Sequence, residues 1–195
     1  ARFGCKIVSM SLGSEEVPEN PEDDPQVKAV ETLTKENNMI FCVAAGNSGP
    51  SYGTINSPGI AEHAITVGAY DPITGQVAPF SSRGPTPDGR VKPDIIMPGV
   101  NILAPTTGIL DGLSPPKLSA RASALSGTSM ATPHASGLVA LMCQYAASRG
   151  IDLTAEDVKS VVKTYGEERE KSNEAGWGML TWGKWREYAR NYLGI

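Results

Sequence analysis

The feature that most constrains this chain is the stretch at residues 126–134, where a run of small residues passes into a long apolar segment, residues 135–147. The pattern becomes helical from Thr128 onward. A set of side chains then recurs at spacings of four, three and four residues, which places them on one helix face. We expect this face to pack inward, and its members are His134, Leu138, Leu141 and Tyr145.

Ser129 is predicted to lie where a loop passes into the first turn of this helix. Backbone N–H groups are free at a helix start, and the helix dipole is positive there. A hydroxyl at this place can attack a carbonyl carbon, and the N–H of the same residue can help to hold the oxyanion that forms. Gly127 has no Cβ, so a substrate can approach closely beside it. The alternative is that Ser129 only caps the helix, since serine is a preferred N-cap residue.

The complete stretch, Ser-Gly-Thr-Ser-Met-Ala-Thr-Pro-His, resembles the nucleophile motif of the subtilisin-like serine proteases, the subtilases. Two further stretches agree with that family in order and spacing. Residues 44–49, Ala-Ala-Gly-Asn-Ser-Gly, resemble its oxyanion-hole segment, and residues 8–13, Val-Ser-Met-Ser-Leu-Gly, resemble its substrate-binding strand. The resemblance implies Ser129 as the nucleophile and Asn47 as the side-chain donor of the oxyanion hole. A neutral amide suits that task, because it donates without a charge that would bind the ground state equally well.

The resemblance also implies a cleft for an extended protein or peptide substrate. Residues 11–13 would hydrogen-bond the substrate as an added strand. Residues 44–46 would wall the pocket for the side chain before the scissile bond. Asn56 would help to form the pocket floor, where its size argues against a deep aromatic pocket. The matching substrate-binding positions are Ser11, Leu12, Gly13, Ala44, Ala45, Gly46 and Asn56.

The general base that such a serine needs is missing from the sequence. The family takes its aspartate from an Asp-Ser/Thr-Gly context and its histidine from a His-Gly-Thr-His helix start, and neither motif occurs here. His63 and His134 are the two histidines, and neither stands at a catalytic position of the family. On a helix, His134 would point away from Ser129 and along the packed face. Asp71 and Asp94 are available carboxylates without a histidine to orient.

We therefore expect residues 1–195 to form the C-terminal portion of a subtilase catalytic domain. The aspartate and histidine would come from an N-terminal half, as a companion chain of the same protease. The first strand begins almost at the chain start, so we expect it to lack a neighbouring strand, and the chain alone to be an unstable monomer. A propeptide or an inhibitor is a further expected partner. The alternative is a non-catalytic peptide-binding module or pseudoprotease that uses the cleft to hold a peptide.

The hydrophobic pattern alternates between strands and helices. With the resemblance, it predicts a three-layer α/β fold, with a mainly parallel sheet flanked by helices and incomplete without the N-terminal half. Strands are expected at residues 6–12, 39–45, 64–69 and 101–104. Helices are expected after Gln26, from Thr128, after Asp152 with a capping box at Thr154 and Asp157, and at the C-terminus. Proline- and glycine-rich turns under the sheet are expected at residues 81–85 and 92–100, and a surface excursion at 106–124.

Some segments leave two interpretations open. The acidic loop at residues 14–25 is either a solvated loop or a functional one, forming a cation site or an acidic rim on the cleft. The aromatic stripe of the C-terminal helix either docks the helix onto the core or forms a partner surface. Its members are Trp182, Trp185, Tyr188 and Tyr192.

Composition argues against several other classes of protein. A net charge of −4 gives no reason to expect a nucleic-acid partner, and no apolar run reaches the roughly 20 residues of a membrane span. Three widely spaced cysteines form neither a disulfide framework nor a metal signature, so we expect buried free thiols. No cofactor is required. Calcium is common in the family, but no site for it is identified. The sequence leaves both a secreted and a cytoplasmic location open.

Overall fold

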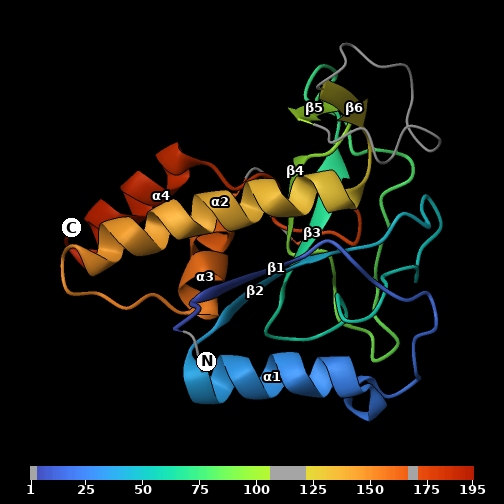
Figure 1. Ribbon diagram of the computed structural model, residues 1–195, viewed down its shortest axis with the longest axis horizontal. Helices are drawn as coiled ribbons and strands as arrows, with labels where there is room; N and C mark the ends of the chain where they lie inside the picture. Colours follow the sequence, from blue (N-terminus) through green and yellow to red (C-terminus); the bar gives the residue numbers. More distant parts are fainter. Residues whose placement is uncertain (1–3, 106–121, 167–170) are drawn as a thin grey trace.

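The computed structural model describes residues 4–105, 122–166 and 171–195, and a four-stranded parallel sheet forms its centre (Figure 1). The sheet order follows the sequence, and each strand pairs in parallel with the next. The strands are β1 (Ile7–Met10), β2 (Ile40–Ala44), β3 (Ile65–Tyr70) and β4 (Ile95–Pro98). The predicted α/β class is confirmed, and so is the mainly parallel sheet.

Helices cover both faces of this sheet, with α1 (Pro25–Asn37) on one face and α2 (Thr128–Ala147) on the other (Figure 1). Successive strand side chains point to opposite faces, so a central strand serves both layers. In β2, Ile40 and Cys42 join the core cluster under α2, whereas Phe41 and Val43 join the cluster under α1. The fold is therefore three-layered, with the sheet in the middle.

The ends of α1 follow from local side-chain chemistry. A short 3-10 helix, Pro21–Asp23, leads into it. The Asp24 side chain then accepts hydrogen bonds from the N–H groups of Gln26 and Val27, which caps the helix start. Asn38 ends the helix in a left-handed conformation that asparagine tolerates better than most residues.

The predicted inward face of α2 is right only in part, because Leu138 and Tyr145 are half-buried against the core cluster but do not form the centre of the contact. The buried face is instead formed by Ala131, Ala135, Val139, Met142 and Ala146, each with 0% exposure. These mostly small side chains let the helix lie close to the sheet. His134 is exposed and Leu141 is 54% exposed, so these two members of the predicted face point toward solvent. Periodicity alone found the helix but could not say which of its two apolar faces was the inner one.

The C-terminal elements pack beside the far half of α2. α3 (Ala155–Tyr165) begins with the predicted capping box. α4 (Trp182–Tyr188) continues into a π-helical turn, Ala189–Leu193. The inner two aromatic residues of the stripe are core, as one interpretation predicted, since Trp185 is 0% and Tyr188 8% exposed. Trp182 and Tyr192 lie at the surface.

Two predicted segments take other forms. Residues 92–100 are not only turns, because they contain strand β4, which completes the sheet beside β3. Residues 106–121 of the predicted surface excursion lie outside the described residues. Its end belongs to β6 (Ala122–Leu125), which pairs antiparallel with β5 (Ile102–Pro105) in a separate two-stranded sheet.

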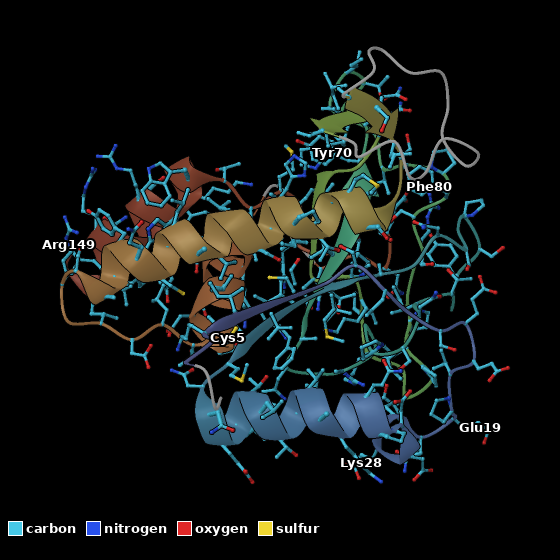
Figure 2. All side chains as sticks on the ribbon, in the orientation of Figure 1. Cys5, Glu19, Lys28, Tyr70, Phe80 and Arg149 are labelled. Atoms are coloured by element: carbon cyan, nitrogen blue, oxygen red, sulfur yellow. The ribbon has the colours of Figure 1, made fainter. Side chains whose placement is uncertain are left out.

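The cysteines are free, but they are not all buried. Cys42 is buried, and burial raises the pKa of its thiol to about 12, whereas Cys143 is only half-buried. Cys5, just before β1, is exposed, which corrects the expectation for that residue (Figure 2). Within the described residues, no helix combines the length and the apolar character that crossing a bilayer would need.

Candidate active site

The predicted site residues follow the carboxyl ends of β1 and β2, which meet at one edge of the parallel sheet. Residues 11–13 continue from β1, and residues 45–47 continue from β2. The first turn of α2 lies at the same edge, because the Gly46 N–H donates to Thr128 Oγ1 over 3.3 Å. Open α/β sheets bind ligands at this kind of edge.

Ser129 is linked directly to the segment that follows β1. The Ser11 hydroxyl donates to the Ser129 carbonyl oxygen at 2.9 Å, and the Ser129 hydroxyl lies 3.3 Å from the Ser11 carbonyl oxygen. Ser129 is half-buried in the first turn of α2, where N–H groups have no acceptor within the helix. Gly127 holds the N-cap position, and no side chain caps the helix. The interpretation of Ser129 as a capping serine is therefore wrong.

Asn47 is held at the start of α2 by a residue that the sequence reasoning did not single out. Both the backbone N–H and the hydroxyl of Thr128 donate to Asn47 Oδ1, at 2.9 and 3.0 Å. Thr128 is 1% exposed. With its oxygen occupied, the Asn47 side chain has only its NH₂ group left to offer. That nitrogen lies beside Gly127, 3.6 Å from where a Cβ would stand.

A cavity of about 250 Å³ lies between these segments. It brings together Ser129, Asn47 and most of the predicted substrate-binding positions; its lining is Leu12, Gly13, Glu15, Ala44, Gly46, Asn47, Asn56, Thr128 and Ser129. Ala45 is fully buried beneath the cavity lining, in the core cluster under α1. Ser11 contacts Ser129 but does not line the cavity.

The Asn56 side chain is packed between the two walls of the cavity. A Cβ on Gly13 would stand 3.1 Å from Asn56 Cβ, and a Cβ on Gly46 would stand 2.6 Å from Asn56 Cγ. Gly46 also has a φ of +109°, which disfavours any residue with a side chain. The two glycines therefore make the room that Asn56 occupies.

Neither histidine lines this cavity. The ring nitrogen Nδ1 of His134 lies 2.7 Å from the Met130 carbonyl oxygen, to which it donates on the exposed side of α2. His63 Nδ1 lies 2.5 Å from Glu31 Oε2, in contact with α1. The structure therefore leaves both histidines apart from the Ser129 hydroxyl.

A second polar centre surrounds Asp94, which the sequence reasoning mentioned only as an available carboxylate. The buried Lys92 donates to Asp94 Oδ2 at 2.6 Å, Lys171 lies 2.7 Å from Oδ1, and Lys159 lies 3.9 Å from Oδ1. The Thr66 N–H also donates to Oδ2. Burial alone would raise the pKa of Asp94, but the three lysines outweigh it and hold that pKa well below its usual range. This network ties β3 to β4 and lies outside the Ser129 cavity.

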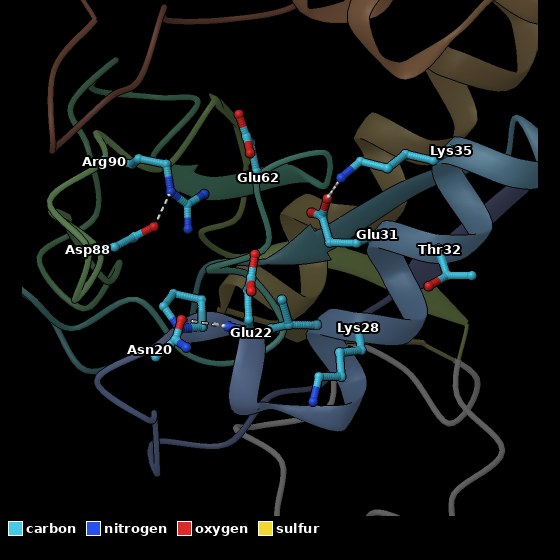
Figure 3. A pocket seen from close by; sticks show the side chains of 11 residues that line it. Asn20, Glu22, Lys28, Glu31, Thr32, Lys35, Glu62, Asp88 and Arg90 are labelled. Atoms are coloured by element: carbon cyan, nitrogen blue, oxygen red, sulfur yellow. Dashed lines mark hydrogen bonds and ion pairs between the residues drawn. The ribbon is translucent and has the colours of Figure 1, made fainter.

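Another cavity, between α1 and the loop at residues 86–90, carries charges of both signs (Figure 3). Four of its charged side chains form two ion pairs: Arg90 Nε lies 2.6 Å from Asp88, and Lys35 lies 3.2 Å from Glu31. Nothing there resembles a nucleophile with a base. The described residues also contain no group of three or more His, Cys, Asp or Glu side chains that could hold a metal ion.

Comparison with known proteins gives this geometry a family context. The sequence pattern of the Subtilase family matches residues 1–178. Serine protease AprX of Bacillus subtilis is 43% identical over 167 residues, which cover 80% of this chain and 37% of AprX. Pyrolysin of Pyrococcus furiosus is 36% identical over 190 residues, which cover 84% of this chain and 13% of pyrolysin. The chain thus spans well under half of the length of either relative.

Solved structures agree on the fold. The structure of the patellamide maturation protease PatA superposes with a TM-score of 0.74 at 25% identity, over 97% of this chain and 64% of that one. The prenylagaramide maturation protease PagA gives a TM-score of 0.73 at 25% identity, over 96% of this chain and 63% of that one.

Proposed function

The chain belongs to the subtilase family of serine proteases, and from that premise we propose that it carries the nucleophile and the oxyanion hole of a serine endopeptidase. Ser129 is the proposed nucleophile and Asn47 the proposed side-chain donor. The observation that carries the proposal is the double hydrogen bond from Thr128 to Asn47 Oδ1, which leaves the Asn47 NH₂ group as a donor beside Ser129.

In the proposed reaction, an extended peptide lies along residues 11–13 as an added strand. The Ser129 Oγ atom bonds to the peptide carbonyl carbon while its proton passes to a general base. The Asn47 NH₂ group and the Ser129 N–H hold the oxyanion. The C–N bond then breaks, the leaving amine takes the proton, and water hydrolyses the acyl ester on Ser129. In these steps this chain supplies the nucleophile and the oxyanion donors, at the sheet edge and the start of α2.

The base and its orienting carboxylate are proposed to lie outside these 195 residues, in an N-terminal companion chain of the same protease. The positions of His63 and His134 support this, because neither lines the cavity with Ser129. The edge of β1 supports it too: within the described residues β1 pairs only with β2, and its side chains are at most half-buried. A further strand can add to such an edge.

The test is labelling of the complete protease with a fluorophosphonate probe, followed by peptide mapping. We expect the adduct on Ser129 and none in a Ser129→Ala variant. Because a positioned base contributes about 10²- to 10⁴-fold, the isolated 195-residue chain should label at least about a hundredfold more slowly. An adduct on another serine, or none in the correctly folded complete protein, would exclude the peptidase. Retained peptide binding in that case would identify a non-catalytic binding module instead.

A further inference from the structure

The cavity beside Ser129 contains one charged side chain among its described lining residues, and that side chain is Glu15. A second cavity of about 370 Å³ shares Glu15 and Asn56 with the first, and Glu15 is again its only charged lining residue. No ion pair joins Glu15 to any cation in the described part of the chain. A carboxylate without a counter-charge therefore stands at the junction of two adjoining cavities.

The backbone fixes the place of this carboxylate. Ser14 and Ser57 exchange two backbone hydrogen bonds, at 2.9 and 3.0 Å, so the residues beside them, Glu15 and Asn56, are held close together. The Ser48 hydroxyl donates to Glu15 Oε1 at 2.6 Å. The Ser48 N–H is in turn anchored on Ser82 Oγ at 3.0 Å. Glu15 Oε1 is thus occupied, and Oε2 is left to accept from a bound group.

Asn56 decides what kind of side chain can reach this carboxylate. Because it fills the space between Gly13 and Gly46, the first cavity is too shallow for a large ring to enter deeply. A long and narrow side chain can instead pass over Asn56 toward Glu15. Lysine and arginine combine this shape with a cationic end, and their methylene stems suit the apolar wall that Leu12 and Ala44 provide.

We propose that Glu15 selects a lysine or arginine side chain immediately before the scissile bond, with Asn56 limiting the depth of the pocket. This inference rests on the proposed peptidase function and names its substrate class. The cationic group donates to Glu15 Oε2, and bound substrate removes water from around the pair, which strengthens the attraction. Glu15 is then a specificity residue, and it takes no part in bond making.

The experiment compares peptides that differ only in the residue before the scissile bond, Arg, Lys, Leu or Phe, as substrates of the complete protease. We expect the ratio of kcat/KM for Arg over Leu to fall at least about tenfold in Glu15→Gln, and the preference for Arg to weaken as salt is raised. Glu16→Gln is the matched control, because Glu16 lines neither cavity. It should leave the ratio within about twofold of the parent value.

A binding measurement separates this inference from the peptidase proposal. In a Ser129→Ala background, the affinity for the Arg peptide over the Leu peptide should again depend on Glu15 and not on Glu16. If the enzyme cleaves peptides but Glu15→Gln and Glu16→Gln change the Arg/Leu ratio equally, the specificity inference is overturned and the peptidase stands. If Ser129 is never labelled but the Arg peptide still binds through Glu15, the peptidase proposal fails and the charge selectivity stands.

Discussion

Replacing Thr128 by valine tests the oxyanion site most sharply, because it removes the hydroxyl group and keeps the backbone N–H that also holds Asn47. Valine keeps the shape of threonine, and the position is 1% exposed, so no cavity opens. The change removes the hydroxyl that donates to Asn47 Oδ1 at 3.0 Å, but keeps the Thr128 N–H that donates to the same atom at 2.9 Å. It also removes the acceptor that the Gly46 N–H reaches at 3.3 Å.

The expected loss follows from those contacts. Asn47 Oδ1 keeps one of its two hydrogen bonds from Thr128. Because one neutral hydrogen bond contributes about 0.5–1.5 kcal/mol, kcat/KM should fall about 2- to 13-fold. Removing Asn47 itself, as Asn47→Ala, should lower kcat about 10²- to 10³-fold, the size known for such a donor in subtilisin. Thr128→Val should therefore have a small effect beside that of Asn47→Ala.

The assay is a double-mutant cycle on kcat/KM of the complete protease. If Thr128 acts by orienting Asn47, then Thr128→Val should change almost nothing once Asn47 is alanine. Thr132→Val is the matched control, because its hydroxyl donates to the Thr128 carbonyl within the same helix, at 2.8 Å. It should alter stability and leave kcat/KM nearly unchanged. An equal loss from Thr128→Val in both backgrounds would refute the orienting role.

Two further predictions concern stability and oxidation. Asp94→Asn leaves the buried Lys92 without its counter-charge. The free energy of unfolding of the complete protease, measured in urea, should therefore fall by about 3–5 kcal/mol. An unchanged urea midpoint would contradict this prediction. Since the folded pKa of Asp94 is depressed, its stabilisation is present above about pH 4 and is lost as the pH falls through the folded value. Met130 adjoins Ser129, so oxidation of its side chain to a polar sulfoxide by peroxide should lower the peptidase activity. The Met130→Ala variant should resist this inactivation by peroxide. Equal inactivation of the two proteins would exclude Met130 as the target.

The fold was largely predictable because its strands and caps are local signals. The apolar runs that became β2 and β3, and the capping box at Thr154 and Asp157, each depend on neighbouring residues only. The inner face of α2 was not predictable, because both of its faces are apolar and only the contact with the sheet decides between them. Strand β4 was missed because flanking prolines, Pro93 and Pro98, resemble turn signals, although Pro98 ends the strand rather than interrupting it.

The candidate site was likewise predictable where it depends on local motifs, and not where it depends on contacts between distant residues. Motif resemblance named Ser129, Asn47 and the cleft positions, and the structure gathers most of them around one cavity. It did not name Thr128 as the anchor of Asn47, because that contact joins residues 81 positions apart. The spacing of Lys92 and Asp94 was a usable signal, since residues two apart on an extended chain share one face. Their partners Lys159 and Lys171 are far along the chain, and no local pattern points to them.

The geometry around Ser129 also bears on where the proposed base would enter. The Ser129 hydroxyl faces the Ser11 carbonyl, on the side of β1, which has no further strand beside it in the described residues. The other neighbouring surface is the outward face of α2, where Leu141 is 54% exposed. A companion segment that added a strand to β1 and laid a helix on this face of α2 would cover both. The exposed residues of this face, His134 and Leu141, are then the surface that we expect the companion to bury.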